Sequence, residues 1–508
     1  MELCKTTFPL DTGCFCAYYG VLRQEVNQQE GIMKSLAVYW EQLPLSAEPF
    51  DVFCHLAGEP GLFFLDSAME SEKLGSYSII GSNPYFVLSS KADVVRYQRE
   101  EFAIARSADP FDELALQIEK FSSPVEDIPV PALGGAIGYF GYDLCHFVEK
   151  LPRSVRDDMA FPDIYFAFYD RFLVYDHKEE TWTAGGTDLR NMGMSAFRDE
   201  IGAWAAICNR RFSEKPPPLP GDDGKSPASS TQTELVPNIE REEYLASVAK
   251  AKEYIAAGDI FQVNFSQRFE GKTSLSPQAL YRRLREANNA PFAAFLSMGD
   301  RSILSSSPER FLRVRGRLVE TRPIKGTRPR VGDEKADEHA KAELIASEKD
   351  NAELAMIVDL ERNDLGRVCD YGSIAVTEPR VLEEYSTVYH LVATIMGKLH
   401  EDKSLIDLVR ATFPGGSITG APKIRAMEII DELEPTARGP YTGAIGYIGF
   451  NGSMDLNIAI RTMLLKNGTV YLQVGGGIVA DSDPDLEYQE TLDKAKAMFE
   501  AVSGVTGK

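Results

Sequence analysis

Two pairs of acidic residues lie in helix-like segments of the second half of the chain, and both pairs have a spacing of three. They are Asp350 with Glu353 and Glu487 with Glu490. Residues three apart share one helix face, where like charges repel unless a cation or solvent relieves them. Carboxylates without neighbouring His or Cys suit Mg²⁺, which binds through one or two carboxylates and keeps several waters. The spacing therefore favours a magnesium site, with two solvated acidic faces as the alternative.

A lysine and three glycines accompany the second acidic pair. Lys494 follows Glu490 by four residues, so it would face the same site and add a positive charge for an anionic substrate. Gly475, Gly476 and Gly477 lie upstream without the spacing of a nucleotide-binding loop. Taken alone, these glycines indicate a bulge or a tight turn.

Lys325 and Glu309 are candidates for nucleophilic and acid–base chemistry. Lys325 lies in a basic segment between Pro323 and Pro329, which restrict the backbone and could fix the ammonium group. A desolvated lysine near other cations has a lowered pKa and can act as a nucleophile. Glu309 lies between two strand-like runs, and burial would raise its pKa and suit it to general-acid catalysis. The alternatives are an exposed basic loop and an exposed acid paired with Arg310.

The glycine-rich segment from Pro414 to Lys423 superficially resembles a phosphate-binding loop. That loop requires Lys and then Ser or Thr after its last glycine, whereas Ala421 and Pro422 follow Gly420 here. The mismatch disfavours a Mg²⁺-dependent phosphoryl-transfer enzyme, which could use the same acidic residues. The segment still leads into a helix beginning near Pro422, whose backbone N–H groups can bind a carboxylate.

Apolar patterning and turn residues indicate the elements that must position these side chains. Strands are predicted at 85–89, 136–141, 167–174, 293–297, 302–306, 311–314, 444–449 and 469–475. Helices are predicted at 198–211, 242–257, 277–288, 335–345, 351–360, 404–410, 423–433 and 486–502. Strands and helices do not alternate strictly, so we expect an α+β fold of layered antiparallel β-sheets flanked by helices.

Composition divides the chain into four parts. Residues 1–32 lack apolar periodicity and contain three of the seven cysteines, so we expect a disordered extension or a translation start at Met33. Residues 33–212 and 239–508 have the patterning of folded regions. Residues 213–238 are rich in Pro, Gly and Ser without an apolar repeat, which is typical of a linker.

The overall charge and cysteine usage exclude several classes of protein. The 508 residues carry 76 acidic and 54 basic side chains, a formal net charge of −22, which disfavours a nucleic-acid binder. No apolar stretch approaches the roughly 18 residues of a membrane-spanning helix, and no secretory leader is evident. The cysteines include no CxxC pair, so neither a disulfide framework nor a zinc site is indicated. We expect a cytoplasmic protein.

Six ordered motifs resemble those of the chorismate-utilising enzymes, the family of anthranilate synthase component I, aminodeoxychorismate synthase component I, isochorismate synthases and salicylate synthases. The motifs are residues 258–264, 307–309, 323–330, 358–364, 413–423 and 475–494. Residues 32–212 resemble the N-terminal half of the aminating members, through residues 64–67 and 134–141. The resemblance implies chorismate as the substrate and the layered antiparallel fold of that family.

The resemblance also implies a role for each candidate side chain. Glu353 and Glu490 would ligate Mg²⁺ at the ring carboxylate of chorismate, supported by Asp350 and Glu487 through water. Glu309 would protonate the departing C4 hydroxyl group. The other matching positions are Tyr441 and Arg461 at the enolpyruvyl carboxylate, Gly475, Gly476 and Lys494 at the ring carboxylate, Thr327 as a further substrate contact, and His390 as the active-site histidine.

Two positions distinguish reactions within the family. Isochorismate and salicylate synthases carry a lysine base where this chain has Gln262, so the addition of water is disfavoured. Anthranilate synthases have alanine where this chain has Lys325, the residue expected of aminodeoxychorismate synthases. That lysine would attack C2 of chorismate, and ammonia would then attack C4 to give 4-amino-4-deoxychorismate for p-aminobenzoate and folate synthesis. Anthranilate synthesis is the alternative.

The sequence also bears on two binding partners, a glutamine amidotransferase subunit and tryptophan. No glutaminase nucleophile segment is recognisable, so we expect ammonia from a separate glutamine amidotransferase subunit. We also expect no lyase extension after Val502, so that a separate lyase would complete p-aminobenzoate. Anthranilate synthases have Leu-Glu-Ser in a tryptophan feedback site, whereas this chain has Leu65-Asp66-Ser67. The departure argues against feedback inhibition and leaves a permanently held tryptophan open, as well as a non-catalytic sensing scaffold.

Overall fold

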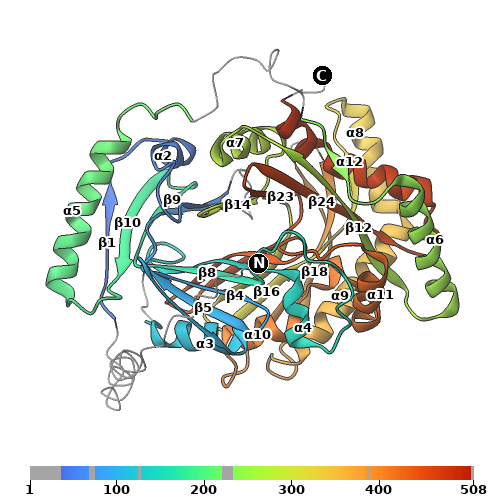
Figure 1. The fold of residues 1–508 in the computed structure, drawn as a ribbon, viewed down its shortest axis with the longest axis horizontal. Coiled ribbons are helices and arrows are strands. Elements are labelled where there is room, and N and C mark those ends of the chain that lie inside the picture. The colour runs from blue at the N-terminus through green and yellow to red at the C-terminus, as the bar shows by residue number, and fades with distance from the viewer. Residues whose placement is uncertain (1–35, 68–74, 124–127, 220–232, 386–387, 505–508) are drawn as a thin grey trace, which may run out of the picture.

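The computed structural model describes residues 36–67, 75–123, 128–219, 233–385 and 388–504. Two antiparallel β-sheets of twelve strands each form the body of the molecule, and helices flank them (Figure 1). The predicted α+β fold with layered antiparallel sheets is confirmed. The predicted extension and the start at Met33 lie outside the described residues, as does the middle part of the predicted linker, residues 220–232.

The first sheet, here called sheet A, brings together strands that are far apart in the sequence. In spatial order its strands are β1 (Val38–Leu43), β10 (Thr181–Thr187), β9 (Arg171–Asp176), β3 (Tyr77–Gly81), β2 (Phe63–Asp66), β13 (Phe292–Met298), β14 (Arg301–Ser307), β23 (Thr462–Lys466), β24 (Thr469–Ile478), β12 (Gln262–Lys272) and β11 (Val236–Pro237), with β20 (Gly420–Ala421) paired to β12.

The second sheet, sheet B, also combines the two halves of the chain. In spatial order its strands are β17 (Ile324–Pro329), β19 (Val388–Lys398), β16 (Leu318–Arg322), β15 (Arg310–Arg315), β22 (Met454–Ile458), β21 (Ala444–Gly449), β7 (Gly135–Phe140), β8 (Ile164–Tyr169), β4 (Phe86–Lys91), β5 (Val94–Arg99) and β6 (Phe102–Ser107), with β18 (Ala375–Glu384) paired to β19. Because β2 pairs with β13 and β7 pairs with β21, each sheet joins residues from both sides of segment 213–238.

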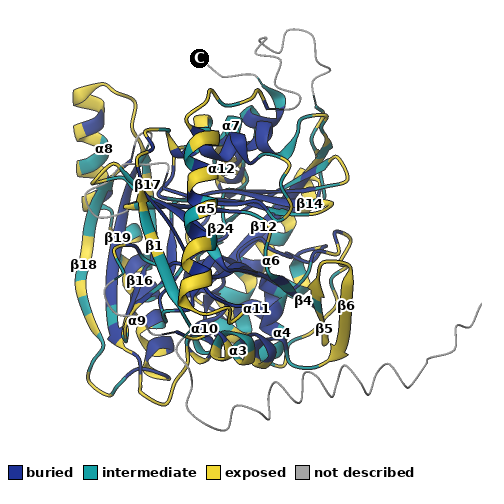
Figure 2. Ribbon diagram, turned by 90° about the vertical axis from the view of Figure 1, so that its left-hand side faces the viewer, coloured by how far each residue is buried: buried dark blue, intermediate teal, exposed yellow. Residues whose placement is uncertain are grey.

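Helices cover the outer sides of both sheets, which leaves the strands largely buried (Figure 2). The α-helices are α2 (Pro49–His55), α3 (Pro110–Lys120), α4 (Cys145–Val148), α5 (Met194–Phe212), α6 (Arg241–Ala257), α7 (Pro277–Ala287), α8 (Glu334–Ala346), α9 (Glu348–Gly366), α10 (Leu405–Thr412), α11 (Lys423–Leu433) and α12 (Pro484–Ser503). Two 3₁₀ turns, η1 (Tyr142–Leu144) and η2 (Gly416–Ile418), complete the described elements. Among the described helices, none is long and apolar enough to cross a membrane.

An apolar core lies between the two sheets. Ile303 and Leu464 contribute to it from sheet A, and Ile137 and Ile445 contribute from sheet B. All four side chains are at most 3% exposed. Burial of apolar surface from both inner faces is the main force that holds stacked sheets together.

One strand prediction fails at a turn. The predicted strand 167–174 is two antiparallel-sheet strands, β8 and β9, which belong to different sheets and are separated by Asp170. The Asp170 carboxylate accepts hydrogen bonds from Arg171 and Arg190, which stabilises the break. An unbroken apolar run does not reveal such a turn, because strands of both sheets are buried on both faces.

The helices that carry the acidic pairs begin at side-chain caps. The Ser347 hydroxyl accepts a hydrogen bond from the backbone N–H of Asp350 at the start of α9. Asp483 caps α12 in the same way, and Pro484 occupies its first turn. These caps fix where each helix begins and so place both acidic pairs within the first two turns.

Candidate active site

Ser417 lies between Lys325 and Glu309, which come from a strand and from the connection between two strands. Lys325 lies in β17 opposite Leu391 of β19, and Glu309 lies in the connection between β14 and β15. Lys325 Nζ donates a hydrogen bond to the Ser417 carbonyl oxygen at 3.2 Å. The Ser417 hydroxyl faces the Glu309 carboxyl and lowers its pKa, although the two groups fall short of strict hydrogen-bond geometry.

Glu309 is a buried carboxyl group, with only 4% of the residue exposed. Burial raises the pKa of Glu309 to about 7, and it outweighs the opposing effects of Ser417, Lys325 and the backbone N–H of Ile324. A carboxylic acid that keeps its proton near neutral pH can give it to a leaving group. The geometry therefore supports the predicted role of Glu309 as a general acid.

Lys325 is partly exposed as a residue, but its ammonium end is enclosed. Burial lowers the pKa of Lys325, the Glu353 and Glu309 carboxylates oppose this shift, and the Lys494 ammonium adds to it. A lowered pKa increases the fraction of neutral amine, which is the nucleophilic form. Lys325 thus has the environment that its proposed chemistry requires, in a strand and not in an exposed loop.

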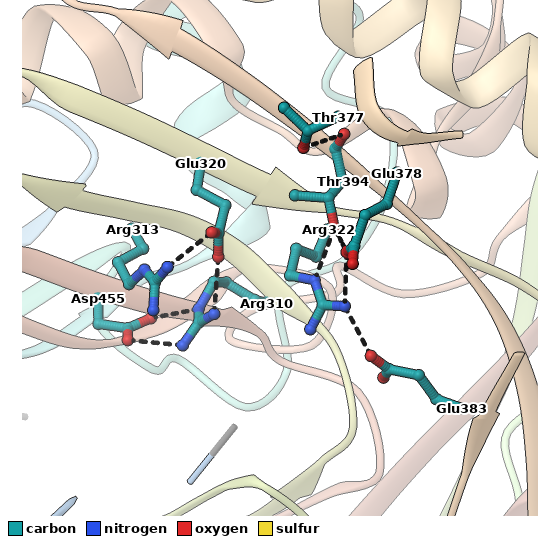
Figure 3. A network of polar contacts seen from close by, with 9 residues as sticks. All are labelled: Arg310, Arg313, Glu320, Arg322, Thr377, Glu378, Glu383, Thr394 and Asp455. Carbon is teal, nitrogen blue, oxygen red and sulfur yellow. Dashed lines mark hydrogen bonds and ion pairs between the residues drawn. The ribbon is translucent and has the colours of Figure 1, made fainter. Parts of the chain in front are cut away.

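An ion-pair network fixes the strand that begins directly after Glu309 (Figure 3). The side chain of Arg310 is 5% exposed and lies between two carboxylates, Asp455 at 3.0 Å and Glu320 at 2.8 Å. Arg313 reaches the other oxygen of Glu320 at 2.6 Å. A buried guanidinium with its donors satisfied on both sides cannot move without losing these bonds, so it holds the backbone next to Glu309.

A second network fixes the strand that leads into Lys325 (Figure 3). Arg322, three residues earlier, pairs with Glu383 at 2.6 Å and donates to Thr394 Oγ1 at 3.0 Å. Its side chain is almost fully buried. Glu309 therefore comes directly before, and Lys325 shortly after, a strand of sheet B that a buried arginine holds in place.

The acidic pairs of α9 and α12 face the same region. Burial raises the pKa of Glu353, the nearby Lys325 ammonium opposes this shift, and Glu490 adds to it. Glu490 itself lies 2.6 Å from Lys494 Nζ, and this ammonium lowers its pKa. Burial also raises the pKa of Glu487, whose carboxylate accepts a hydrogen bond from Ser482 at 2.6 Å.

Gly475 and Gly476 form the bare backbone that faces these carboxylates. The Gly475 carbonyl oxygen accepts a hydrogen bond from Lys494 Nζ at 3.0 Å. A Cβ atom at Gly476 would lie 3.3 Å from a Glu487 oxygen and 3.7 Å from a Glu490 oxygen. Glycine thus keeps open the space into which two carboxylates and one ammonium point.

The interpretation of the three glycines as a bulge or tight turn is wrong. They lie within β24 in regular antiparallel register with β12, Gly476 opposite Phe265 and Gly477 opposite Asn264. A Cβ atom at Gly477 would meet the Gln262 amide at 2.3 Å. The glycines are needed because neighbouring side chains and backbone atoms approach the strand closely, and the local sequence pattern does not show this requirement.

Asp350 lies at the edge of this region and pairs with Arg328 at 3.2 Å. Within the described ranges, no three His, Cys, Asp or Glu side chains are close enough together to enclose a metal ion. A magnesium ion does not need such a group, because one or two carboxylates, substrate oxygens and waters are enough. The two acidic helices offer that smaller donor set.

The remaining predicted residues line the same region from other elements. His390 is buried in β19, and its Nδ1 lies 2.9 Å from Thr327 Oγ1. Burial lowers the pKa of His390 to about 4, so its imidazole is neutral at pH 7. Arg461 has a left-handed backbone, with φ of 51°, and its charge acts on both His390 and Tyr441. Burial raises the pKa of Tyr441.

Two residues near the predicted set escaped the sequence analysis. Ser417 contacts Lys325 through its backbone carbonyl oxygen. Every residue has this group, so the residue type gives no signal. The Lys349 ammonium opposes the rise in the pKa of Glu353 caused by burial, and it contributes to the lowered pKa of Glu490 on the other helix. Its spacing of four before Glu353 was a signal that could have identified it, because such residues share a helix face.

A separate cavity lies where β2 and β13 meet the ends of β15, β21 and β22. Its walls include Leu65, Phe292 and Tyr447, together with Asp66 and Arg310. The Asp66 carboxylate is held by Arg285 Nε at 2.7 Å, while its other oxygen has no hydrogen-bond partner among the described residues. The cavity therefore has both apolar and charged residues in its walls.

The fold and the candidate site together define a class of protein. An enclosed lysine, a buried acid with a pKa near neutrality, and facing carboxylates and cations form a site for acid–base chemistry on an anionic molecule. The protein is therefore an enzyme, and its fold consists of two packed antiparallel sheets.

Comparison with known proteins identifies the family. The family model described as chorismate binding enzyme matches residues 65–500, so the chain belongs to the chorismate-binding enzyme family. Anthranilate synthase component 1 of Acetivibrio thermocellus is 38% identical over 481 residues, covering 92% of this chain and 97% of that protein. Aminodeoxychorismate synthase component 1 of Bacillus subtilis is 38% identical over 438 residues, covering 85% and 91%.

A solved structure agrees with this family. Anthranilate synthase component I from Streptococcus pneumoniae superposes with a TM-score of 0.73 and 33% sequence identity, covering 85% of this chain and 93% of that chain. The predictions of the family and of its fold are confirmed. The relatives include both aminodeoxychorismate and anthranilate synthases at similar identity, so the particular reaction rests on the site.

Proposed function

We propose that this protein is component I of an aminodeoxychorismate synthase. It would convert chorismate and ammonia to 4-amino-4-deoxychorismate, for p-aminobenzoate and folate synthesis in the cytoplasm. The observation that carries the proposal is the enclosed Lys325 amine beside the buried Glu309 acid, with Ser417 between them. Membership of the family disfavours phosphoryl transfer and a non-catalytic scaffold as alternatives.

The proposed chemistry divides amination into two allylic displacements. The neutral Lys325 amine forms a bond to C2 of chorismate, both ring double bonds shift around C1, C6 and C5, and the C4–O bond breaks. Glu309 gives its proton to the departing oxygen, so water leaves. Ammonia then bonds to C4, both double bonds shift back, and the C2–N bond to Lys325 breaks, while Glu309 recovers a proton from the incoming nitrogen.

Cationic and hydrogen-bonding groups would hold the two carboxylates of chorismate during these steps. We assign Lys494 and the backbone of Gly475 and Gly476 to the ring carboxylate, since they surround one open space. Arg461 and Tyr441 would bind the enolpyruvyl carboxylate, because the planar guanidinium donates two parallel hydrogen bonds to such a group. Thr327 and the neutral His390 would line the substrate as a hydrogen-bonded pair.

Anthranilate synthesis is the second candidate, since relatives of both kinds match this chain over most of its length. Incubation with chorismate, Mg²⁺ and ammonium distinguishes the two reactions. We expect p-aminobenzoate only after a separate lyase is added, and no fluorescent anthranilate. Anthranilate formed without the lyase would refute the proposal.

Ammonia is proposed to come from a glutamine amidotransferase subunit. Replacing ammonium by glutamine in the same assay should give no product until that subunit is added. Glutamine-dependent turnover by this chain alone would contradict this part of the proposal.

Magnesium is proposed as the cofactor, held by Glu353 and Glu490, and the bound ion would supply positive charge to the ring carboxylate. Glu490→Gln is expected to weaken Mg²⁺ binding in the presence of chorismate by about tenfold or more, because one of two charged ligands is lost. Glu487→Gln should have a smaller effect, since Glu487 is assigned a supporting role. Calorimetric titration with MgCl₂ measures both, and Asp485→Asn on the exposed side of α12 is the control. Equal Mg²⁺ affinity of Glu490→Gln and wild type would contradict the assignment.

The cavity beside Asp66 is proposed to hold a tryptophan permanently. The apolar walls formed by Leu65, Phe292 and Tyr447 suit an indole ring. Denatured protein should release a stoichiometric amount of tryptophan, while added tryptophan should leave activity unchanged. Calorimetry that shows a freely exchanging, inhibitory tryptophan would contradict this prediction.

A further inference from the structure

The segment from Phe413 to Pro422, between α10 and α11, carries Ser417 into the active site and is called here the Ser417 loop. The lysine that follows it, Lys423, does not point toward solvent or substrate. Its side chain is 11% exposed, and its ammonium turns back beneath the loop to pair with Asp364 of α9. Lys423 Nζ also donates to the carbonyl oxygens of Thr412 at 3.0 Å and Pro414 at 2.9 Å.

These three contacts use the whole hydrogen-bonding capacity of the Lys423 ammonium, which has three donors and no acceptor. No donor is left for a phosphate or a carboxylate of a ligand. In a phosphate-binding loop the lysine binds the phosphate of a ligand, whereas Lys423 binds carbonyl oxygens at the start of its own loop.

The two ends of the Ser417 loop are held by different parts of the molecule. After Ser417, backbone N–H groups of Phe261 and Asn264 donate to Ala421 and Thr419, and Arg438 donates to Ile418. Before Ser417, the Pro414 carbonyl oxygen accepts its hydrogen bond from Lys423. The Thr419 hydroxyl donates to the Gly415 carbonyl oxygen at 3.0 Å, so the incoming half of the loop is held by Lys423 together with a contact within the loop.

Two glycines allow this incoming half to pack closely against neighbouring side chains. A Cβ atom at Gly416 would lie 2.7 Å from Leu360 of α9, and a Cβ atom at Gly415 would lie 2.9 Å from Ile458. Asp364 follows Leu360 by four residues, so both side chains lie on the same face of α9. One helix face therefore contacts the loop through Leu360 and holds its lysine through Asp364.

We propose that Lys423 and Asp364 are positioning residues, a buried ion pair that fixes the main chain of Ser417 and thereby aligns Lys325 with Glu309. Ser417 is the one described residue whose carbonyl oxygen receives Lys325 Nζ and whose hydroxyl faces Glu309. The inference rests on the proposed function in that it takes Lys325 and Glu309 as the reacting groups. A displacement of about 1 Å between reacting groups can reduce turnover about 100-fold.

The test removes both charges together, so that neither is left buried alone. In the double variant Lys423→Met/Asp364→Asn, we expect kcat to fall about 10- to 100-fold while the KM for chorismate changes less than about threefold. A smaller folded fraction would also lower the apparent kcat at unchanged KM, so kcat is expressed per folded molecule, counted by the stoichiometry of chorismate binding and by circular dichroism. Arg425→Met, which removes exposed ion pairs from the same helix α11, is the matched control and should keep wild-type kcat.

A second variant covers the case in which the double variant does not fold. Lys423→Arg keeps the charge beside Asp364 but cannot place the same donors on Thr412 and Pro414, so kcat should fall about tenfold. A kcat within twofold of wild type in either folded variant would overturn the proposal. So would a loss confined to KM.

The same experiment separates this inference from the proposed function. Turnover is followed as chorismate consumption, and the wild-type product identifies the reaction independently of the variants. In a Lys325→Ala background, the Lys423 substitution should have a smaller effect on kcat than it has in wild type, because the aligned group is already gone. Fully additive effects would overturn the alignment role, whichever product the wild type forms.

Discussion

Replacing Lys325 by alanine is expected to reduce the rate of C4 amination about 10³-fold, because the covalent route is lost and one direct displacement must replace two allylic steps. Chorismate affinity should stay within a few-fold of wild type, since other cations, among them Lys494 and Arg461, are assigned to its carboxylates. The measurement is the rate of aminodeoxychorismate formation from chorismate and ammonium, read through a coupled lyase. Equilibrium binding of chorismate is measured in parallel.

Two observations would show that the loss is chemical. Mass spectrometry of acid-quenched wild-type turnover samples should detect a substrate-derived adduct on Lys325, and the alanine variant should show none. Lys335→Ala, an exposed lysine of α8, is the control and should keep full activity. Undiminished product formation by Lys325→Ala, without rescue by added base, would remove the covalent role and leave anthranilate synthesis as the better account.

The sequence alone could locate much of the site because part of its geometry is local. The spacing of three between Asp350 and Glu353 and between Glu487 and Glu490 is enough to place each pair on one helix face, and both pairs do lie in helices. That α9 and α12 face a common space depends on the order of strands in two sheets. Spacing carries no information on that order, and only the family resemblance supplied it.

The sequence was least informative where backbone groups perform the function. Gly475 to Gly477 looked like a turn because a glycine run is usually read from its own conformational freedom, whereas here the neighbours of the strand require it. Ser417 contributes a carbonyl oxygen, which every residue has. Lys423 finds Asp364 59 positions away and two carbonyl oxygens of its own loop, and no motif encodes these contacts.

Long-range ion pairs are a further feature that the sequence did not reveal. The alternative in which Glu309 is an exposed acid paired with Arg310 is wrong, because Arg310 is buried and pairs with Asp455 and Glu320. Separating the two residues has a chemical consequence. A guanidinium paired to Glu309 would hold the carboxyl ionised, whereas its absence leaves burial to keep the proton in place.

The kcat/KM for chorismate should depend on pH through the protonation of Glu309. Glu309 must be protonated to act, and its pKa is about 7, so the active fraction falls as the pH rises through this value. Deprotonation of Lys325 has the opposite effect, since only the neutral amine reacts. The profile of kcat/KM for chorismate should therefore be bell-shaped, with one inflection near pH 7, when it is measured at constant free ammonia.

Glu309→Gln is expected to lower kcat/KM about 10²- to 10⁴-fold, because glutamine keeps the shape of the side chain but has no proton to give. The residual activity should rise with pH and then level off, since only the ionisation of Lys325 remains. Glu361→Gln is the matched control, because Glu361 is also buried, has a pKa raised to about 8, and accepts a hydrogen bond from Thr321 at 2.9 Å. The control should keep its falling limb. If Glu309→Gln kept a bell-shaped profile and Glu361→Gln lost it, the proton for the C4 hydroxyl would come from the second carboxyl, and the assignment of the general acid would pass to Glu361.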